Sequence, residues 1–196
     1  LLQHIATATP AYNALIDTGA LVTGLSNLQV AKALMGYGLV DVDAVVFLDE
    51  LDRKMTLLRH GGKVVSLAEC GVALERRFSF YDQVHTTGMD IEQLMNAHAA
   101  LTLGKDMVFR DYAQGAFRLR KIGAGQRLTL HIIPEVMQLI GSFVSRQRGE
   151  SVATYSAAFR AMRLTALARL SAFGEGDIQS VAPAPMPASA SSVERA

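Results

Sequence analysis

The sequence predicts an α/β protein with a mostly parallel sheet. A β-hairpin is inserted in this sheet, and further helices follow it at the C-terminal end of the chain. Two observations support this class. Apolar, β-prone runs alternate along the chain with segments of helical spacing, and half of the 196 residues are hydrophobic, enough to fill a core. A chain of this length suits one domain of roughly 150 residues with appendages.

The first part of the chain predicts a buried strand and then a helix. The strand lies within residues 12–18, includes the run ALID, and ends at Gly19. Ser26 is of the type that caps helices, because its side chain can accept a hydrogen bond from a free backbone N–H. A helix over about residues 27–36 places four apolar side chains on one face, namely Leu28, Ala31, Leu34 and Met35.

The middle of the chain predicts two further strands and a hairpin. Residues 44–49 (AVVFLD) form an almost unbroken apolar run, which is typical of a strand covered on both sides. Residues 54–67 have two β-prone halves around Gly61-Gly62, the usual signal of a hairpin. Residues 78–85 (FSFYDQVH) predict another strand.

The second half predicts two more strands around a helix. The strands are expected at 97–104 and 127–133, and the helix over residues 109–123. Pro134 stands where a first-turn proline belongs and opens a helix to about residue 147.

Composition divides the chain into three parts. Residues 1–133 hold the predicted α/β lobe, and residues 134–175 hold a helical extension, in which about 151–172 has apolar residues at helical spacing. Residues 176–196 are rich in Pro, Ala and Ser and are expected to be disordered. The N-terminus lacks Met, so the chain is expected to be a fragment of a larger protein.

Charge and cysteine content narrow the function classes. The net charge is +1, so no overall field favours nucleic acid or an anionic membrane. The single cysteine, Cys70, rules out an internal disulfide and suits a reducing compartment, so we expect an intracellular, cytoplasmic protein. No run approaches the ~20 apolar residues of a membrane span, and the start of the chain has no signal-peptide pattern.

A polar segment, YDQVHTTGMDIEQ (residues 81–93), leaves the strand predicted to end at Val84. Sheets of this class bind ligands at the carboxyl ends of their strands. The segment is therefore expected at the ligand-binding edge of the sheet.

Basic side chains cluster in DYAQGAFRLRKIGAGQ, residues 111–126. Gln114 and Arg118 are four apart and share a helix face, and Arg120 and Lys121 follow. Guanidinium groups bind phosphate bidentately and stabilise charge in phosphoryl transfer, so the cluster predicts a site for a phosphate chain. The alternative is a basic amphipathic helix whose arginines are only solvated.

Taken in order, the two segments resemble motifs V and VI of superfamily-2 helicases and SecA-type translocases. There, a Gly-x-Asp loop touches the nucleotide and couples the lobes, and arginines of the second motif reach the γ-phosphate of ATP. The matching residues are Gly88 and Asp90 in the loop, with Gln114, Arg118, Arg120 and Lys121 in the arginine motif. The family pattern is Gly-Arg-x-Gly-Arg, whereas residues 117–120 of this chain read Phe-Arg-Leu-Arg.

This resemblance implies a second RecA-like lobe that contributes nucleotide- and phosphate-binding residues to ATP hydrolysis. The sequence contains no P-loop, so ATP and Mg²⁺ would bind only together with an upstream lobe. Nucleic acid, polypeptide and ubiquitin stay open as substrates.

A longer resemblance covers about residues 12–135. The stretches ALIDTGALVTG, VVFLDELDRKMTLLRHGG, YDQVHTTGMDI and LTLGKDMVFRDYAQGAFRLRKIGAGQ are similar to the conserved region of very large eukaryotic proteins labelled ubiquitinyl hydrolase. The resemblance implies thiol-dependent removal of ubiquitin from proteins, with ubiquitin or a ubiquitinated protein as partner. The family loop is closer to His-Thr-Arg-Gly-Thr-Asp, so Thr87 and Met89 depart from it.

Such a hydrolase needs a thiolate activated by a histidine, and a third group that orients the imidazole. Cys70 is the single thiol, His85 follows fifteen residues later, and Asp82 or Asp90 could orient the ring. The candidate catalytic set is Cys70, His85 and Asp90. The alternative is that Cys70 is a small buried apolar residue beside Gly71.

Other polar residues are expected to play structural roles. Asp49, Glu50 and Asp52 follow a buried strand and could hold Mg²⁺, although capping of the turn into the hairpin is favoured. The remaining histidines show no metal-ligand spacing, so no metal site is predicted. Three hypotheses for function remain: a thiol hydrolase of the ubiquitin system, the arginine-bearing lobe of a nucleotide-driven motor, and a degenerate lobe kept as a scaffold.

Overall fold

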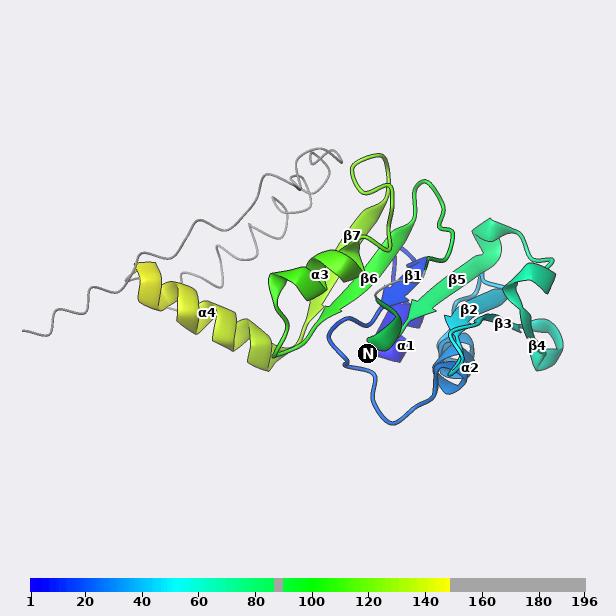
Figure 1. The fold of residues 1–196 in the computed structure, drawn as a ribbon, viewed down its shortest axis with the longest axis horizontal. Helices are drawn as coiled ribbons and strands as arrows, with labels where there is room; N and C mark the ends of the chain where they lie inside the picture. The colour runs from blue at the N-terminus through cyan, green and yellow to red at the C-terminus, as the bar shows by residue number, and fades with distance from the viewer. Residues whose placement is uncertain (87–89, 149–196) are drawn as a thin grey trace, which may run out of the picture.

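The predicted α/β class is confirmed by the computed structural model, which describes residues 1–86 and 90–148 (Figure 1). In this part of the chain, seven strands form one mixed sheet in the order β4-β3-β2-β5-β1-β6-β7. Strands β2, β5, β1, β6 and β7 are parallel, and β3 and β4 run antiparallel as a hairpin at one edge.

The strands are β1 (Ala14–Ile16), β2 (Ala44–Leu48), β3 (Lys54–Leu58), β4 (Val64–Ser66), β5 (Arg77–Tyr81), β6 (His98–Leu103) and β7 (Arg127–Ile132). The α-helices are α1 (Leu2–Ala6), α2 (Asn27–Tyr37), α3 (Phe109–Ala116) and α4 (Pro134–Arg148). Short 3₁₀ turns follow at η1 (His60–Gly62), η2 (Leu67–Glu69), η3 (Leu74–Arg76) and η4 (Val84–Thr86).

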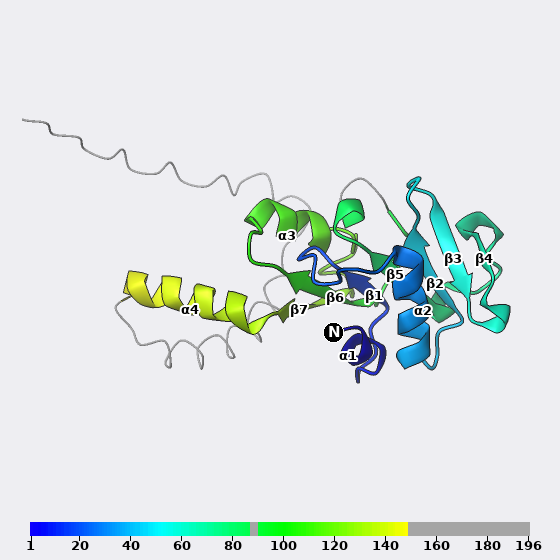
Figure 2. The same ribbon diagram turned by 90° about the horizontal axis from the view of Figure 1, so that it is seen from below.

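Helices cover both faces of the sheet and create two apolar clusters. Side chains of α1 and α2, including Ile5 and Leu34, pack on one face against strand residues such as Phe80. On the other face, Ala116 at the end of α3 and Leu119 beyond it pack against the sheet. Figure 2 shows α3 above the sheet and α1 below it, while α4 projects away beyond β7. Within residues 1–86 and 90–148, none of the helices has both the length and the apolar character needed to cross a membrane.

Several local predictions are confirmed residue by residue. Ser26 caps α2, and its side chain and that of Gln29 bond each other's backbone N–H in a capping box. Strand β2 is buried along its whole length between β3 and β5. The hairpin turns at Gly61 (φ 79°) and Gly62 (φ 62°), both in the left-handed region that glycine adopts at no steric cost. Helix α4 begins at Pro134 as predicted.

Two predicted element ends are wrong, and one helix was not predicted. Helix α3 ends at Ala116 rather than residue 123, because i→i−3 hydrogen bonds of the Arg118 and Leu119 N–H groups tighten the chain into a turn that buries Leu119. Strand β5 ends at Tyr81, three residues before Val84, where the chain turns into η4. The short helix α1 was missed. The helix expected at 151–172 and the tail at 176–196 lie outside the described residues.

A buried carboxylate ties the carboxyl ends of the central strands together. Asp17 follows β1 and accepts the backbone N–H groups of Leu21 and Val22 at 3.0 and 2.9 Å. The hydroxyl of Thr102, near the end of β6, donates to Asp17 at 2.6 Å and accepts the N–H of Gly19 at 2.9 Å. The loop that leaves the middle of the sheet is therefore held by charge-assisted hydrogen bonds.

Next to this network, the chain just after β1 and the chain just after β6 approach so closely, at Gly19 and Gly104, that only glycine fits. A Cβ atom on Gly104 would lie 2.4 Å from the carbonyl oxygen of Gly19. Gly104→Ala is therefore expected to lower the free energy of unfolding by about 1–3 kcal/mol, as overpacking does elsewhere. Urea denaturation followed by circular dichroism measures the change.

Gly36→Ala is the matched control for this substitution. Gly36 lies in α2 with open space around its Cβ position, so alanine should stabilise the protein by about 0.5–1 kcal/mol. Equal effects of the two substitutions would contradict the close contact between Gly19 and Gly104.

Candidate functional site

The predicted site residues fall into two separate groups. One surrounds His85, in η4 just after β5, and the other surrounds Asp90, in the middle of the same connection, while Cys70 lies apart from both. Gly88, predicted to contact phosphate, lies with Thr87 and Met89 outside the described residues.

His85 is held between two carboxylates. The residue is 8% exposed, its Nδ1 atom is hydrogen-bonded to Asp82, and its Nε2 atom lies 2.8 Å from Asp52 Oδ1. Asp82 directly follows β5, whereas Asp52 lies in the turn between β2 and β3. The imidazole therefore links the ends of two neighbouring parallel strands.

Asp49 stabilises the turn that carries Asp52. Asp49 Oδ1 accepts the backbone N–H groups of Leu51 and Arg53 at 3.0 and 2.9 Å, and its Oδ2 forms an ion pair with Arg53 at 2.7 Å. Asp49 thus caps the turn into the hairpin, as the sequence favoured. Asp52 has a φ of 59°, a left-handed conformation that Asp tolerates better than most residues.

These carboxylates change the proton affinity of His85. Burial alone would lower its pKa, because it penalises the charged imidazolium, but the hydrogen bonds to Asp82 and then Asp52 outweigh that penalty. The pKa of His85 therefore lies above its ordinary value of 6.5. The group is a cationic imidazolium over a wider pH range than a free histidine.

The three candidate catalytic residues, Cys70, His85 and Asp90, are each hydrogen-bonded to residues outside the candidate set. Cys70 follows η2, is 8% exposed, and its carbonyl accepts a hydrogen bond from Arg77 Nη2 at 3.4 Å. Both ring nitrogens of His85 are bonded to carboxylates, and Asp90 is bonded to arginines. Among the described residues, no hydrogen bond joins Cys70 to His85.

The candidate phosphate site contains a carboxylate bracketed by two arginines. Asp90 Oδ1 accepts from Arg118 Nη1 at 3.0 Å, and Oδ2 accepts from Arg120 Nε and Nη2 at 3.1 and 2.7 Å. The Arg118 side chain is 8% exposed and that of Arg120 is 55% exposed. One guanidinium is therefore fixed inside the protein, and the other is open to solvent.

The other two residues predicted for this site have different positions. The carbonyl of Gln114 accepts from Arg118 Nε at 3.4 Å, so the last turn of α3 helps to orient that guanidinium. Lys121 is exposed, and its backbone N–H donates to Gln126 Oε1 at 2.6 Å. The structure thus groups Asp90, Arg118 and Arg120, with Gln114 beside them.

Tyr81, the last residue of β5, positions the chain that carries Asp90. Its side chain is fully buried, and its hydroxyl accepts the N–H of Ile91 at 2.9 Å and donates to the Ile91 carbonyl at 3.2 Å. Burial raises the pKa of Tyr81, so the hydroxyl stays neutral and keeps both bonds. Neither the Tyr81 contact nor the partnership of His85 with Asp52 was predicted, because each depends on a turn of the chain that local patterns do not show.

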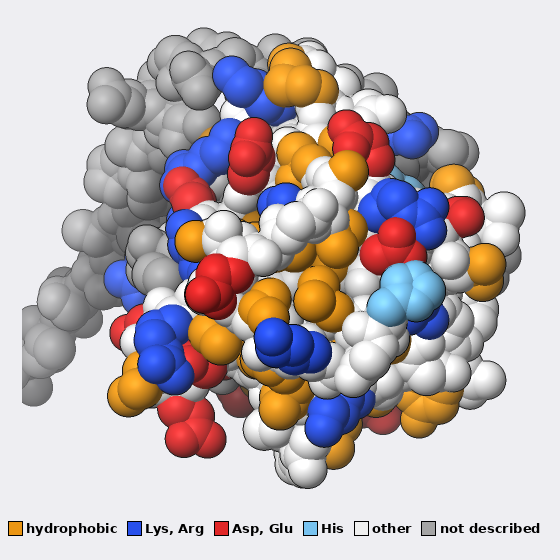
Figure 3. All heavy atoms as spheres, turned by 90° about the vertical axis from the view of Figure 1, so that its right-hand side faces the viewer, with side chains coloured by type: hydrophobic (Ala, Val, Ile, Leu, Met, Phe, Trp, Pro, Cys, Tyr) orange, Lys and Arg blue, Asp and Glu red, His pale blue; other side chains and the backbone are white. Residues whose placement is uncertain are grey.

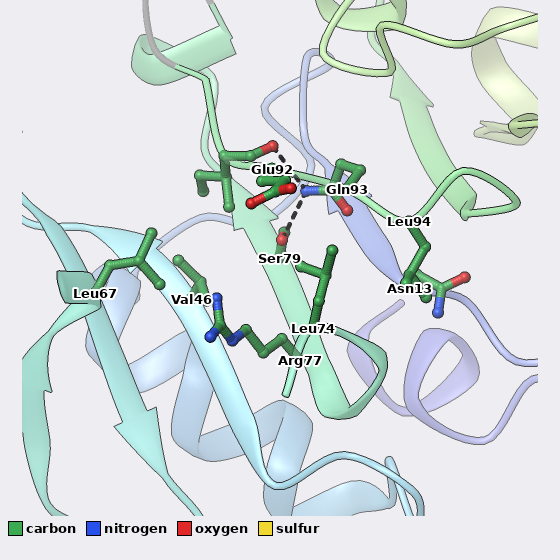
Figure 4. Close-up of a pocket in the computed structure, with 10 residues that line it drawn as sticks. Asn13, Val46, Leu67, Leu74, Arg77, Ser79, Glu92, Gln93 and Leu94 are labelled. Atoms are coloured by element: carbon green, nitrogen blue, oxygen red, sulfur yellow. Dashed lines mark hydrogen bonds between the residues drawn. The ribbon is translucent and has the colours of Figure 1, made fainter. Parts of the chain in front are cut away.

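Two of the hollows on the described part of the protein adjoin the sheet. The smaller, about 160 Å³, is shown in Figure 4, where the Gln93 side chain points to Ser79 on β5 and Arg77 borders the opposite side. It is below the ~300 Å³ at which small-molecule sites usually begin. The larger, about 520 Å³, lies at the carboxyl ends of β2 and β5 and includes Asp82 and His85 in its lining.

The described residues show neither a group of metal ligands nor, on the face in Figure 3, the basic patch typical of nucleic-acid binding. Within residues 1–86 and 90–148, no three His, Cys, Asp or Glu side chains converge as metal ligands would. On the hairpin side of the molecule, basic and acidic side chains are interspersed around exposed hydrophobic ones (Figure 3). This face therefore has no large patch of one charge.

No protein-family model, curated protein or solved structure matches the chain.

Because the pKa of His85 is raised in the folded protein, the free energy of unfolding should depend on pH. Folding favours the protonated ring, so its stabilising contribution is fully present below about pH 6.5 and is lost as the pH rises through the higher pKa of the folded state. The difference in unfolding free energy between the native protein and His85→Gln should therefore shrink as the pH rises above 6.5. Urea denaturation at a series of pH values measures it.

His60→Gln serves as the control, since His60 is exposed in the turn of the hairpin. A difference for His85→Gln that is independent of pH would contradict the assignment. Asp52→Asn should reduce the pH dependence while tolerating the left-handed φ.

Proposed function

We propose that the chain is the arginine-bearing lobe of a nucleotide-driven motor of the helicase or translocase type, in a protein of the family labelled ubiquitinyl hydrolase. The observation that carries the proposal is the bonding of Asp90 to both Arg118 and Arg120. These residues carry the resemblance to the two motor motifs. They meet in the folded chain although Asp90 is 28 and 30 residues away from them.

The charges of the group favour an anionic ligand. Two guanidinium groups face one carboxylate, so the group keeps a net positive charge that can take up a further anion. Arg120 already approaches one carboxylate oxygen through two N–H groups, and a phosphate oxygen can accept bonds of the same kind. Its exposed side chain can turn toward a ligand, while buried Arg118 holds Asp90 in place.

In this proposal Arg120 acts on a nucleotide held by another lobe. A lobe with a P-loop would hold the β- and γ-phosphates and Mg²⁺, and Arg120 would reach across the cleft to the γ-phosphate. There its guanidinium would stabilise the charge that develops as the γ-phosphoryl group is transferred to water. An arginine in this role typically contributes about 10³–10⁵ in kcat.

Ubiquitin hydrolysis by Cys70 has less support from the contacts of the described residues. The thiol is buried, and the imidazole that would activate it is bonded to Asp82 and Asp52. We therefore assign the arginine role, rather than the thiol, to this part of the family. The proposal puts the protein in the cytoplasm, where ATP is abundant and the single cysteine stays reduced.

The arginine group should bind tripolyphosphate, and its variants should respond in opposite directions. Asp90→Asn removes the negative charge beside the two guanidinium groups and is expected to tighten binding several-fold, whereas Arg120→Ala is expected to weaken it several-fold. Isothermal titration at low ionic strength measures the affinity, which should fall as salt is added.

Arg110→Ala is the matched control, because Arg110 lies on α3 with a side chain that is 79% exposed. Equal affinities of the native protein, Asp90→Asn and Arg120→Ala would refute the phosphate site and favour the scaffold hypothesis. In a protein that also carries the P-loop lobe, Arg120→Ala should lower the kcat of ATP hydrolysis by about 10³ or more.

Cys70 should not react with a thiol-reactive ubiquitin probe in the folded protein. The thiol is buried, and among the described residues no imidazole is hydrogen-bonded to it, so it lacks the activating base that attack on the probe requires. Mass spectrometry of the treated protein, with Cys70→Ser as control, detects the adduct. A covalent adduct on the native chain alone would reverse the assignment in favour of the thiol hydrolase.

A further inference from the structure

The larger hollow, of about 520 Å³, is independent of the arginine group and has no role in the proposed function. It lies where β2 and β5 end, and its wall also includes the start of α2 and the hairpin. Its volume is in the range of small-molecule sites, and the carboxyl edge of a parallel sheet is where α/β proteins bind ligands. The lining residues that the argument uses are Leu28, Met55, Val64, Glu50, Asp82 and His85.

The floor of the hollow is apolar. Leu28 on α2, Met55 on β3 and Val64 on β4 are only partly buried and pack against the core from its edge. Leu51, in the turn after β2, adds a side chain that is 71% exposed at the rim. Covering this surface with an apolar group would remove it from water and release free energy.

The rim of the hollow has an excess of negative charge. Asp49 is neutralised by Arg53, while Asp82 and Asp52 share one imidazolium, that of His85. Glu50 is exposed and forms no ion pair among the described residues. A cation at this rim would meet a carboxylate that has no competing partner, whereas a phosphate would be repelled.

We propose that the hollow binds a small amphipathic amine, with its apolar body on Leu28, Met55 and Val64 and its ammonium group at Glu50 and Asp82. The apolar floor supplies most of the affinity, and the carboxylates select the charge of the head group. This ligand class is the opposite of the one expected at the arginine group, so the two sites are chemically distinct.

Three probes of matched size test the proposal on the 196-residue chain: 2-phenylethylamine, 2-phenylethanol and phenylacetate. Binding is followed by the NMR shifts of the methyl groups of Leu28, Met55 and Val64. The amine should bind up to about fivefold more tightly than the alcohol, since an exposed charge pair contributes up to about 1 kcal/mol, and phenylacetate should bind least.

Glu50→Gln separates the charge from the apolar surface. It should bring the affinity for the amine to within about twofold of that for the alcohol, and leave the alcohol unchanged. Glu75→Gln, an exposed acid on η3 at the start of β5, is the matched control and should change neither. Equal binding of the three probes, binding that favours phenylacetate, or shifts confined to other methyl groups would each overturn the proposal.

Discussion

Parallel pairing of β2, β5, β1 and β6 is the constraint on which both candidate sites depend. It brings the carboxyl ends of strands that are distant in sequence to one edge of the sheet. The chain must leave each strand there, so polar turns gather at that edge. Asp17 makes the edge rigid, because its carboxylate accepts bonds from the loop after β1 and from Thr102 at the end of β6. A fixed edge lets side chains on different loops meet in defined geometry.

Two buried, basic side chains, those of His85 and Arg118, then determine which loops contact each other. His85 and Arg118 are both almost completely buried, and each is bonded to a carboxylate from a distant part of the chain, Asp52 and Asp90 respectively. Burial of the cation costs hydration, so each pair contributes less to stability than its Coulomb energy suggests, although the carboxylates of Asp52 and Asp90 stay largely in water. Loss of one partner is costly, since it leaves a buried charge unpaired. These contacts therefore specify the arrangement of the loops more than they strengthen the fold.

The group around Asp90 and the group around His85 also differ in their balance of charges. Around Asp90 two arginines face one carboxylate, whereas around His85 two carboxylates face one imidazole ring. Asp82, His85 and Asp90 all belong to the single connection from β5 to β6, and Tyr81 anchors this connection at Ile91.

Sequence patterns predicted what depends on neighbours in the chain. The Ser26 cap, the Gly61-Gly62 turn and the buried run of β2 follow from local hydrogen bonding, backbone freedom and apolar periodicity, and all three are confirmed. The order of motifs also pointed to Asp90 and to the arginines before any contact between them was known. Each motif contributes one side of the contact, Asp90 from the first and the arginines from the second.

The tertiary structure alone decided where α3 ends and which partners the charged side chains take. Leu119 is drawn into the core, which turns the chain after Ala116 although the residues beyond it have helical spacing. His85 is bonded to Asp52 across 33 residues, a contact that exists only because β2 and β5 lie side by side. The sequence by itself determined the strands, caps and turns, because those rest on local preferences. The sites depend on long-range packing, which brings charges together only after the sheet has formed.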